Sequence, residues 1–259
     1  MLTIIFKKGK YFKKLIENCN SLVSNGTLNF TEHGINFQST DANNISVINF
    51  NIPLEAFEKY NVPINQTLSI NFERLVKIFK TYKDTDEMKM THKNNTDSII
   101  FTFTNNTTKK RVKQTVKLIN LEISELEIPE YKEDCELIIT PMTIYNIIKD
   151  FNNFGDYVKI ETIEGDEDLD IPNKIKFKVS DLEGESEFLY EENGEDIKEI
   201  NINNNINLNF NITYLTKFGN FCAMSNSLKI KLTKDYPLEY NYKTPIGTIK
   251  LYLSPQIDE

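Results

Sequence analysis

Six lysines recur on four short amphipathic segments of this chain. In each segment the apolar residues follow the i, i+3, i+4, i+7 spacing of one helical face, and lysine stands on the opposite face. The lysines are Lys13, Lys14, Lys77, Lys80, Lys149 and Lys217. Ammonium groups can bind phosphate oxygens without reading a base sequence. A solvated helix face is the alternative for any one segment, and the recurrence in all four favours a phosphate-binding surface.

The net charge of the chain makes the position of these lysines important. The sequence has 259 residues and a formal net charge of −8, so the molecule as a whole should repel nucleic acid. Hydrophobic content of 39% and charged content of 26% are typical of a globular protein. No apolar run approaches the ~20 residues that span a bilayer, and three widely spaced cysteines are expected to be reduced thiols.

No group of residues predicts catalysis. His33 and His92 lie among turn-like residues and are expected at the surface, and the usual phosphate-loop, zinc-protease and nucleophile-elbow motifs are absent from the sequence. The acidic run at 164–170 lacks the ligand spacing of a calcium loop, which favours a solvated loop. We therefore expect no enzyme activity, no cofactor and no metal. A metal-dependent nuclease that uses the acidic loops is the alternative, and absence of cleavage with magnesium or manganese would dismiss it.

The lysine-bearing segments belong to a repeated unit. A strand, a helix and further strands occur four times, at intervals of roughly sixty to seventy residues, with helices expected near 11–20, 72–79, 141–151 and 215–222. Short strands with few helices indicate antiparallel sheets covered on one face by helices. The prediction is an α+β fold with two similar domains, at residues 1–117 and 136–259.

Residues 118–135 form the predicted connection between these domains. Their apolar residues are regularly spaced, but Pro129 and the glutamates at 122, 125, 127, 130 and 133 exclude a buried central strand. A connection of this length without a regular element is usually functional or a linker. We expect an extended strap that presents Leu126, Ile128 and Pro129 to a partner outside the chain.

Several stretches, in this order, resemble the proliferating cell nuclear antigen family of DNA sliding clamps. They are KKLIE at 13–17, GINFQSTDANNISVINF at 34–50, LINLEISELEIPE at 118–130, FGD at 154–156, YPLEY at 236–240 and IKLYLSPQIDE at 249–259. The resemblance covers essentially the whole chain. It implies the DNA-clamp fold, with sheets outside, helices lining an inner face and three copies closed head to tail into a ring. The edge strands that would pair between copies are expected at 109–117 and around 175–179.

The same resemblance implies a DNA polymerase processivity factor that encircles duplex DNA. The six lysines would face the duplex, and a clamp loader would open the ring. Polymerase and other replication and repair proteins would bind through a motif of the form Q-x-x-aliphatic-x-x-aromatic-aromatic. The expected location is the nucleus, or a cytoplasmic replication site if the source is a large DNA virus. The alternative is a clamp-like polymerase subunit that forms no closed ring, which a stable monomer at micromolar concentration would favour.

A hydrophobic pocket for the partner peptide is also implied. The matching positions are Thr40, Asn44, Ile45, Val47, Leu126, Ile128, Pro129, Pro237, Tyr252, Ser254, Pro255 and Ile257. Such a pocket buries an aliphatic and an aromatic anchor at a preformed site. Thr40 and Asn44 replace an apolar residue and a histidine common in the family, which implies a different peptide preference. Glu164 stands where many relatives carry a modifiable lysine.

Overall fold

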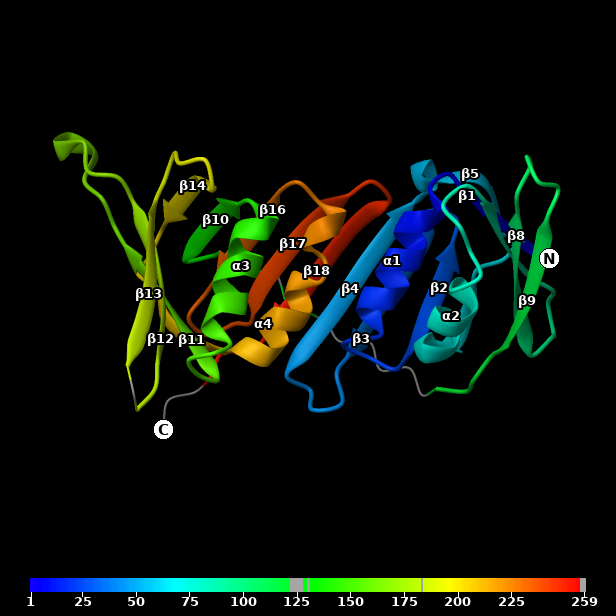
Figure 1. Cartoon of the computed structure of the whole chain (residues 1–259), viewed down its shortest axis with the longest axis horizontal. Helices are drawn as coiled ribbons and strands as arrows, with labels where there is room; N and C mark the ends of the chain where they lie inside the picture. Colours follow the sequence, from blue (N-terminus) through cyan, green and yellow to red (C-terminus); the bar gives the residue numbers. More distant parts are fainter. Residues whose placement is uncertain (122–127, 130, 183, 257–259) are drawn as a thin grey trace. The chain divides into compact units, whose positions relative to one another are not determined.

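The computed structural model describes residues 1–121, 128–129, 131–182 and 184–256. Within these residues the chain forms two compact units, each with two sets of hydrogen-bonded strands and two α-helices (Figure 1). The first unit holds residues 1–42, 48–121 and 244–249, and the second holds described residues from 43–47, 128–243 and 250–256. The α+β class predicted from the sequence is confirmed.

The first unit contains helices α1 (Gly9–Cys19) and α2 (Phe72–Phe79) and the short helix η1 (Leu54–Ala56). One set of strands runs in the order β5 (Phe57–Asn61), β1 (Leu2–Phe6), β7 (Glu87–His92), β8 (Ser98–Thr104), β9 (Arg111–Lys117). The other runs in the order β6 (Gln66–Asn71), β2 (Asn25–Thr31), β3 (Gly34–Thr40), β4 (Ser46–Pro53). The neighbours in the first set, and β6 with β2 and β2 with β3, pair antiparallel.

The second unit repeats this plan with helices α3 (Pro141–Phe151) and α4 (Ile212–Gly219) and the short helices η2 (Glu167–Leu169) and η3 (Cys222–Met224). One set of strands runs in the order β13 (Glu185–Glu191), β12 (Lys174–Ser180), β11 (Tyr157–Ile163), β15 (Asn207–Asn211). The other runs in the order β14 (Ile197–Ile202), β10 (Cys135–Ile139), β16 (Leu228–Leu232), β17 (Leu238–Thr244), β18 (Gly247–Leu253). The last residue of β17 and the first three of β18 are counted with the first unit. Antiparallel pairing joins β13 through to β15, and β14 through to β17.

The helices begin where the sequence provides a suitable first turn. Asn71 and Asn211 precede α2 and α4, and their side-chain oxygens accept hydrogen bonds from the backbone N–H of Arg74 at 2.8 Å and of Thr213 at 3.0 Å. This pairing satisfies N–H groups that have no partner inside a helix. Pro141 opens α3, where its missing N–H costs nothing. Helices α1 and α2 pack against each other, as do α3 and α4, and each pair lies over the strands of its own unit (Figure 1).

The apolar faces of these helices form the core of each unit. Phe12 of α1 is fully buried and stacks on Phe6 at 4.4 Å, and Phe79 of α2 meets Phe101 edge to face at 5.2 Å. In the second unit Phe218 of α4 packs on Tyr240 at 5.7 Å. Each such side chain stabilises the fold by about 1.5–3 kcal/mol relative to exposure to water. Burial of this face leaves the opposite face of each helix to the lysines.

The structure corrects three expectations from the sequence. The strand at 175–179 is not an edge, because β12 pairs with both β11 and β13, and the edge of that sheet is β13. His92 is buried, with 6% exposure and its Nδ1 at 3.0 Å from the carbonyl oxygen of Ser98. Helix α4 ends at Gly219, so Cys222 lies on the separate turn η3.

Candidate functional site

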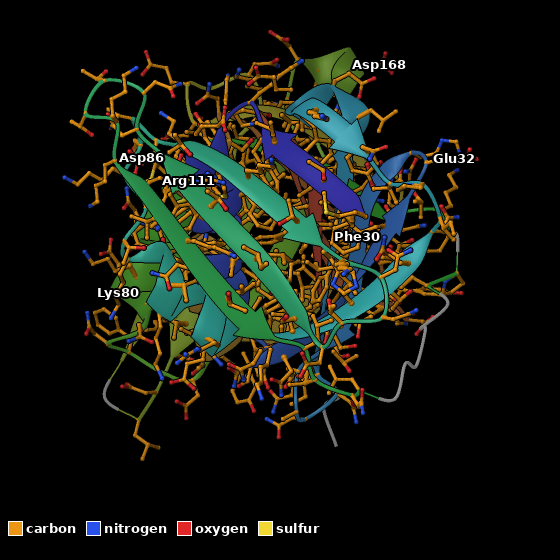
Figure 2. The ribbon with its side chains drawn as sticks, turned by 90° about the vertical axis from the view of Figure 1, so that its right-hand side faces the viewer. Phe30, Glu32, Lys80, Asp86, Arg111 and Asp168 are labelled. Carbon is orange, nitrogen blue, oxygen red and sulfur yellow. The ribbon has the colours of Figure 1, made fainter. Side chains whose placement is uncertain are left out.

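The predicted lysines of the first unit lie on the solvent side of α1 and α2. Lys14, Lys77 and Lys80 are exposed and Lys13 is half-exposed. Figure 2 shows Lys80 at the periphery of this unit and Phe30 in its interior. Lys77 is not a free cation, because its Nζ lies 2.6 Å from Glu73 Oε1, and this hydrogen bond lowers the pKa of Glu73. Of the four predicted lysines in this unit, Lys13, Lys14 and Lys80 therefore contribute most of the positive charge.

Two further cations on the same helices are not among the residues predicted from the sequence. Lys10 on α1 and Arg74 on α2 are exposed. Lys10 lies three and four positions before Lys13 and Lys14, and Arg74 lies three positions before Lys77, which places each residue on the same helical face as the lysines that follow. The i, i+3, i+4 spacing in the sequence was the signal that could have found them.

In the second unit the predicted lysines stand in the last turns of their helices. Lys149 is exposed on α3, and Lys217 is half-exposed on α4 with its Nζ 5.2 Å from the centre of the Tyr214 ring. A cation at a helix C-terminus is favoured by the helix dipole, whatever else it binds. These two positions therefore support a phosphate-binding surface less strongly than the cluster on α1.

The structure brings together part of the predicted partner-peptide surface in the second unit. The backbone N–H of Ser254 donates to the carbonyl oxygen of Ile45 at 3.0 Å, which joins the start of the C-terminal tail to the 43–47 segment. Ile45 is 37% exposed, Asn44 and Ser254 are exposed, and Val47 and Pro255 are half-buried. Thr40 is half-exposed at the end of β3 in the first unit, and Leu126 and Ile257 lie outside the described residues.

The end of the connecting segment docks beside Pro237. The Tyr131 ring stacks on Tyr236 with centroids 4.5 Å apart, and its hydroxyl donates to the carbonyl oxygen of Pro237 at 3.3 Å. Burial raises the pKa of Tyr131 to about 12. Ile128 is half-buried and Pro129 is exposed a few residues before this anchor. The stack of Tyr131 on Tyr236 was not predicted, because a contact between residues so far apart in sequence has no local signal.

A charged network fixes the next residues of the segment. Lys231 Nζ on β16 lies 3.1 Å from Glu133 Oε2 and 3.8 Å from Glu136 Oε2, and Lys229 bonds Glu136 from the same strand. The pKa of Glu133 is lowered, first by a hydrogen bond from its own backbone and then by Lys231. The surface that carries Ile128 and Pro129 is therefore anchored on its C-terminal side by one aromatic stack and one ion pair.

Two sheet edges carry opposite charges. β9 lies at one end of its sheet and β13 at one end of another, so among the described strands each has a single neighbour. Alternate residues of β9 are exposed cations, namely Arg111, Lys113 and Lys117, and alternate residues of β13 are exposed anions, namely Glu185, Glu187 and Glu191. Such edges present unpaired backbone N–H and C=O groups.

The acidic run at 164–170 folds into a closed turn. Asp166 and Ile171 form a β-bridge, and Asp166 Oδ1 accepts hydrogen bonds from the backbone N–H of Asp168 and Leu169. Figure 2 shows Asp168 at the periphery. Across the described part of the chain, no group of three or more His, Cys, Asp or Glu side chains is placed to hold a metal ion. The described helices also include none with the length and apolar character to cross a membrane.

Two α+β units with paired helices and antiparallel sheets define the two-domain DNA-clamp fold. The family model described as "Proliferating cell nuclear antigen, N-terminal domain" matches residues 1–126, and "Proliferating cell nuclear antigen, C-terminal domain" matches residues 127–257. The chain is 25% identical over 276 residues to "Proliferating cell nuclear antigen 1" of Plasmodium falciparum, from isolates K1 / Thailand and 3D7. Each alignment covers 100% of this chain and 98% of the relative.

The chain belongs to the proliferating cell nuclear antigen family. Membership indicates a DNA sliding clamp and processivity factor of DNA replication. Family proteins are non-enzymatic, nuclear scaffolds, with DNA and replication proteins as partners and trimers as their assembly.

The Glu133 anchor predicts a pH-dependent contribution to stability. Replacing Glu133 by Gln should lower the free energy of unfolding at pH 7 by about 0.5–1 kcal/mol, since the lost ion pair is partly exposed. Because the folded-state pKa of Glu133 is depressed, the contribution is complete above its unfolded pKa and disappears as pH falls through the folded value. Urea unfolding of both proteins from neutral to acidic pH measures this. A difference that does not shrink at acidic pH would contradict the assignment.

Proposed function

We propose that three copies of this chain close head to tail into a ring around duplex DNA and tether polymerases to it. In this proposal, residues 1–117 and 136–259 are the two clamp domains of each copy, and residues 118–135 are the strap between them. The observation that carries the proposal is the complementarity of the edges β9 and β13. A chain with two complementary but different edges builds a heterologous contact, which gives a ring when the rotation closes.

Backbone pairing is the first part of this complementarity. An unpaired edge strand can add a strand from another chain, with main-chain hydrogen bonds supplying affinity. If only one edge carried exposed lysines, their role would be to prevent edge-to-edge aggregation of the sheets. Here the edge with Arg111, Lys113 and Lys117 has a counterpart with Glu185, Glu187 and Glu191. Opposite charges across a sheet stabilise a pair and like charges destabilise it, so β9 should prefer β13 over a second β9.

The lysine helices supply the inner surface of the proposed ring. A chain of net charge −8 gains no general attraction to DNA, but the exposed faces of α1 and α2 are locally basic through Lys13, Lys14 and Lys80. Contacts to phosphate oxygens position a protein on the duplex without selecting a sequence. Such contacts suit a protein that moves along DNA, and Lys149 and Lys217 would extend them in the second domain.

The partner-peptide surface supplies the tether. We propose that Ile45, Val47, Ile128, Pro129 and Pro237, together with the other predicted positions, receive a segment of the form Q-x-x-aliphatic-x-x-aromatic-aromatic. A partner held on a ring that cannot leave the DNA rebinds at high effective concentration. Opening of the closed ring would require a clamp loader. The proposed location is the nucleus, or a viral replication site if the source is a large DNA virus.

Exchanging the charges of the two edges tests ring assembly. Lys113→Glu with Lys117→Glu, or Glu185→Lys with Glu187→Lys, should each raise the apparent dissociation constant of the trimer by about 100-fold or more, since facing like charges cost several kcal/mol. Combining all four substitutions restores opposite charges and should restore the trimer. Light scattering after size-exclusion chromatography measures the mass of each species.

Lys59→Glu, an exposed position on β5 at the other edge of the same sheet, is the matched control and should leave the trimer unchanged. Trimers in both single-edge variants, or monomers in the fourfold variant, would contradict pairing of β9 with β13. A wild-type monomer at micromolar concentration would support the clamp-like subunit without a closed ring.

A charge at Ile128 tests the partner-peptide surface. Ile128→Glu should weaken binding of a synthetic peptide carrying the motif by about 100-fold, because a carboxylate replaces an apolar contact at a desolvated anchor. Calorimetric titration gives the affinity, and the trimer should persist. Lys132→Glu, at an exposed position of the same segment, should bind as the wild type does. Unchanged binding by Ile128→Glu would show that the surface lies elsewhere.

A further inference from the structure

Glu239 is a buried carboxylate on the side of β17 that faces away from the core. Leu238, Tyr240 and Tyr242 have at most 1% exposure and point into the core, so the alternation of a strand places Glu239 on the opposite face. Its side chain is nevertheless only 8% exposed. Burial of an ionised carboxylate is unfavourable unless the group has partners. The partners of Glu239 therefore indicate what it does.

Three polar groups surround this carboxylate. Asn241 Nδ2 donates to Oε1 at 3.2 Å, and Lys250 Nζ lies 3.5 Å from Oε1. The Tyr252 hydroxyl donates to the carboxylate from β18, the strand beside β17 in the sheet. Lys250 and Tyr252 alternate along β18 with the core residues Leu251 and Leu253 and therefore lie on the same outer face. The buried charge is thus paired, and one of its bonds fixes the hydroxyl of Tyr252.

Tyr252 belongs to the proposed partner-peptide surface. It is 5% exposed, so its ring is buried. Burial, with the charge of Glu239 and the hydrogen bond to it, raises the pKa of Tyr252. Tyr131, which anchors the connecting segment, is close enough to interact electrostatically with both Tyr252 and Glu239.

We propose that Glu239 is a positioning residue for partner binding: it fixes the Tyr252 ring in the orientation that receives the partner peptide. This inference rests on the proposed partner-peptide function. A side chain whose orientation is fixed before binding loses less conformational freedom when the partner binds. Because the only hydroxyl proton of Tyr252 is committed to Glu239, the oxygen faces a partner as a hydrogen-bond acceptor.

A purely structural role makes a different prediction. If Glu239 only neutralised Lys250, its loss would affect partner binding equally whether or not Tyr252 carries a hydroxyl. If Glu239 acts through that hydroxyl, its loss has no further effect once the hydroxyl is gone. A double-mutant cycle distinguishes these two cases because it isolates the coupling between two side chains.

The cycle uses the full-length protein with Glu239→Met, Tyr252→Phe and both together, titrated by calorimetry with a synthetic peptide of the form Q-x-x-aliphatic-x-x-aromatic-aromatic. We expect Glu239→Met to weaken binding about 10-fold, Tyr252→Phe by a similar factor, and the double variant no more than Tyr252→Phe alone. Glu239→Gln keeps an oxygen that can accept from Tyr252 and should stay within about threefold of the wild type. Circular dichroism establishes that each variant is folded.

Equal loss from Glu239→Met in the wild-type and Tyr252→Phe backgrounds would overturn the inference, as would unchanged affinity. Should Glu239→Met fail to fold, Tyr252→Phe alone still tests the contact, because wild-type affinity without the hydroxyl would also overturn it. A wild-type protein that binds no such peptide would refute the proposed function itself, and the inference with it. A wild type that binds while the cycle shows no coupling refutes only the role of Glu239.

Discussion

An acidic protein can hold a polyanion only where its cations are concentrated and its carboxylates are kept away. In this chain the separation follows from helix geometry. The apolar stripe of each helix must face the sheets, and Phe12, Leu15 and Ile16 of α1 are fully buried for that reason. The opposite face is then free for Lys13 and Lys14, while the acidic run at 164–170 folds into a separate turn whose carboxylate oxygens partly serve its own backbone.

The same separation by charge operates at the sheet edges. β9 and β13 each have a single neighbour among the described strands, and each exposes one sign of charge. Intramolecular ion pairs already moderate the acidic edge, since Lys178 lies 2.6 Å from Glu185 and Lys174 lies 2.6 Å from Glu191. An incoming basic strand would therefore compete with β12 for these carboxylates. Exposed charge pairs are also screened by salt, so main-chain hydrogen bonds would have to hold the proposed contact at high ionic strength.

The helices and the fourfold repeat could be predicted from the sequence, because period and spacing are local properties. Pairing could not. The alternation at 175–179 predicts a strand, but the position of a strand within its sheet is not a local property, and β13 rather than β12 is the edge. β1, β5 and β14 escaped prediction because a five- or six-residue strand with irregular burial leaves little periodic signal. Tyr131, Tyr236 and Glu239 gain their roles from residues distant in sequence, which no local pattern records.

The central claim is that the ring holds DNA by enclosing it. The most direct test compares DNA whose free end is blocked before incubation with the protein and DNA whose free end is blocked afterwards. Linear duplex is immobilised by one end, and its free end is capped with a bulky protein either before or after incubation with the wild-type protein. If the ring encloses DNA, the protein should stay on the DNA in high salt only when the cap is added after incubation, because salt cannot release a threaded ring. Binding through phosphate contacts alone would weaken steeply with salt. Retention that is equal for the two orders of capping, or absent from both, would contradict the account.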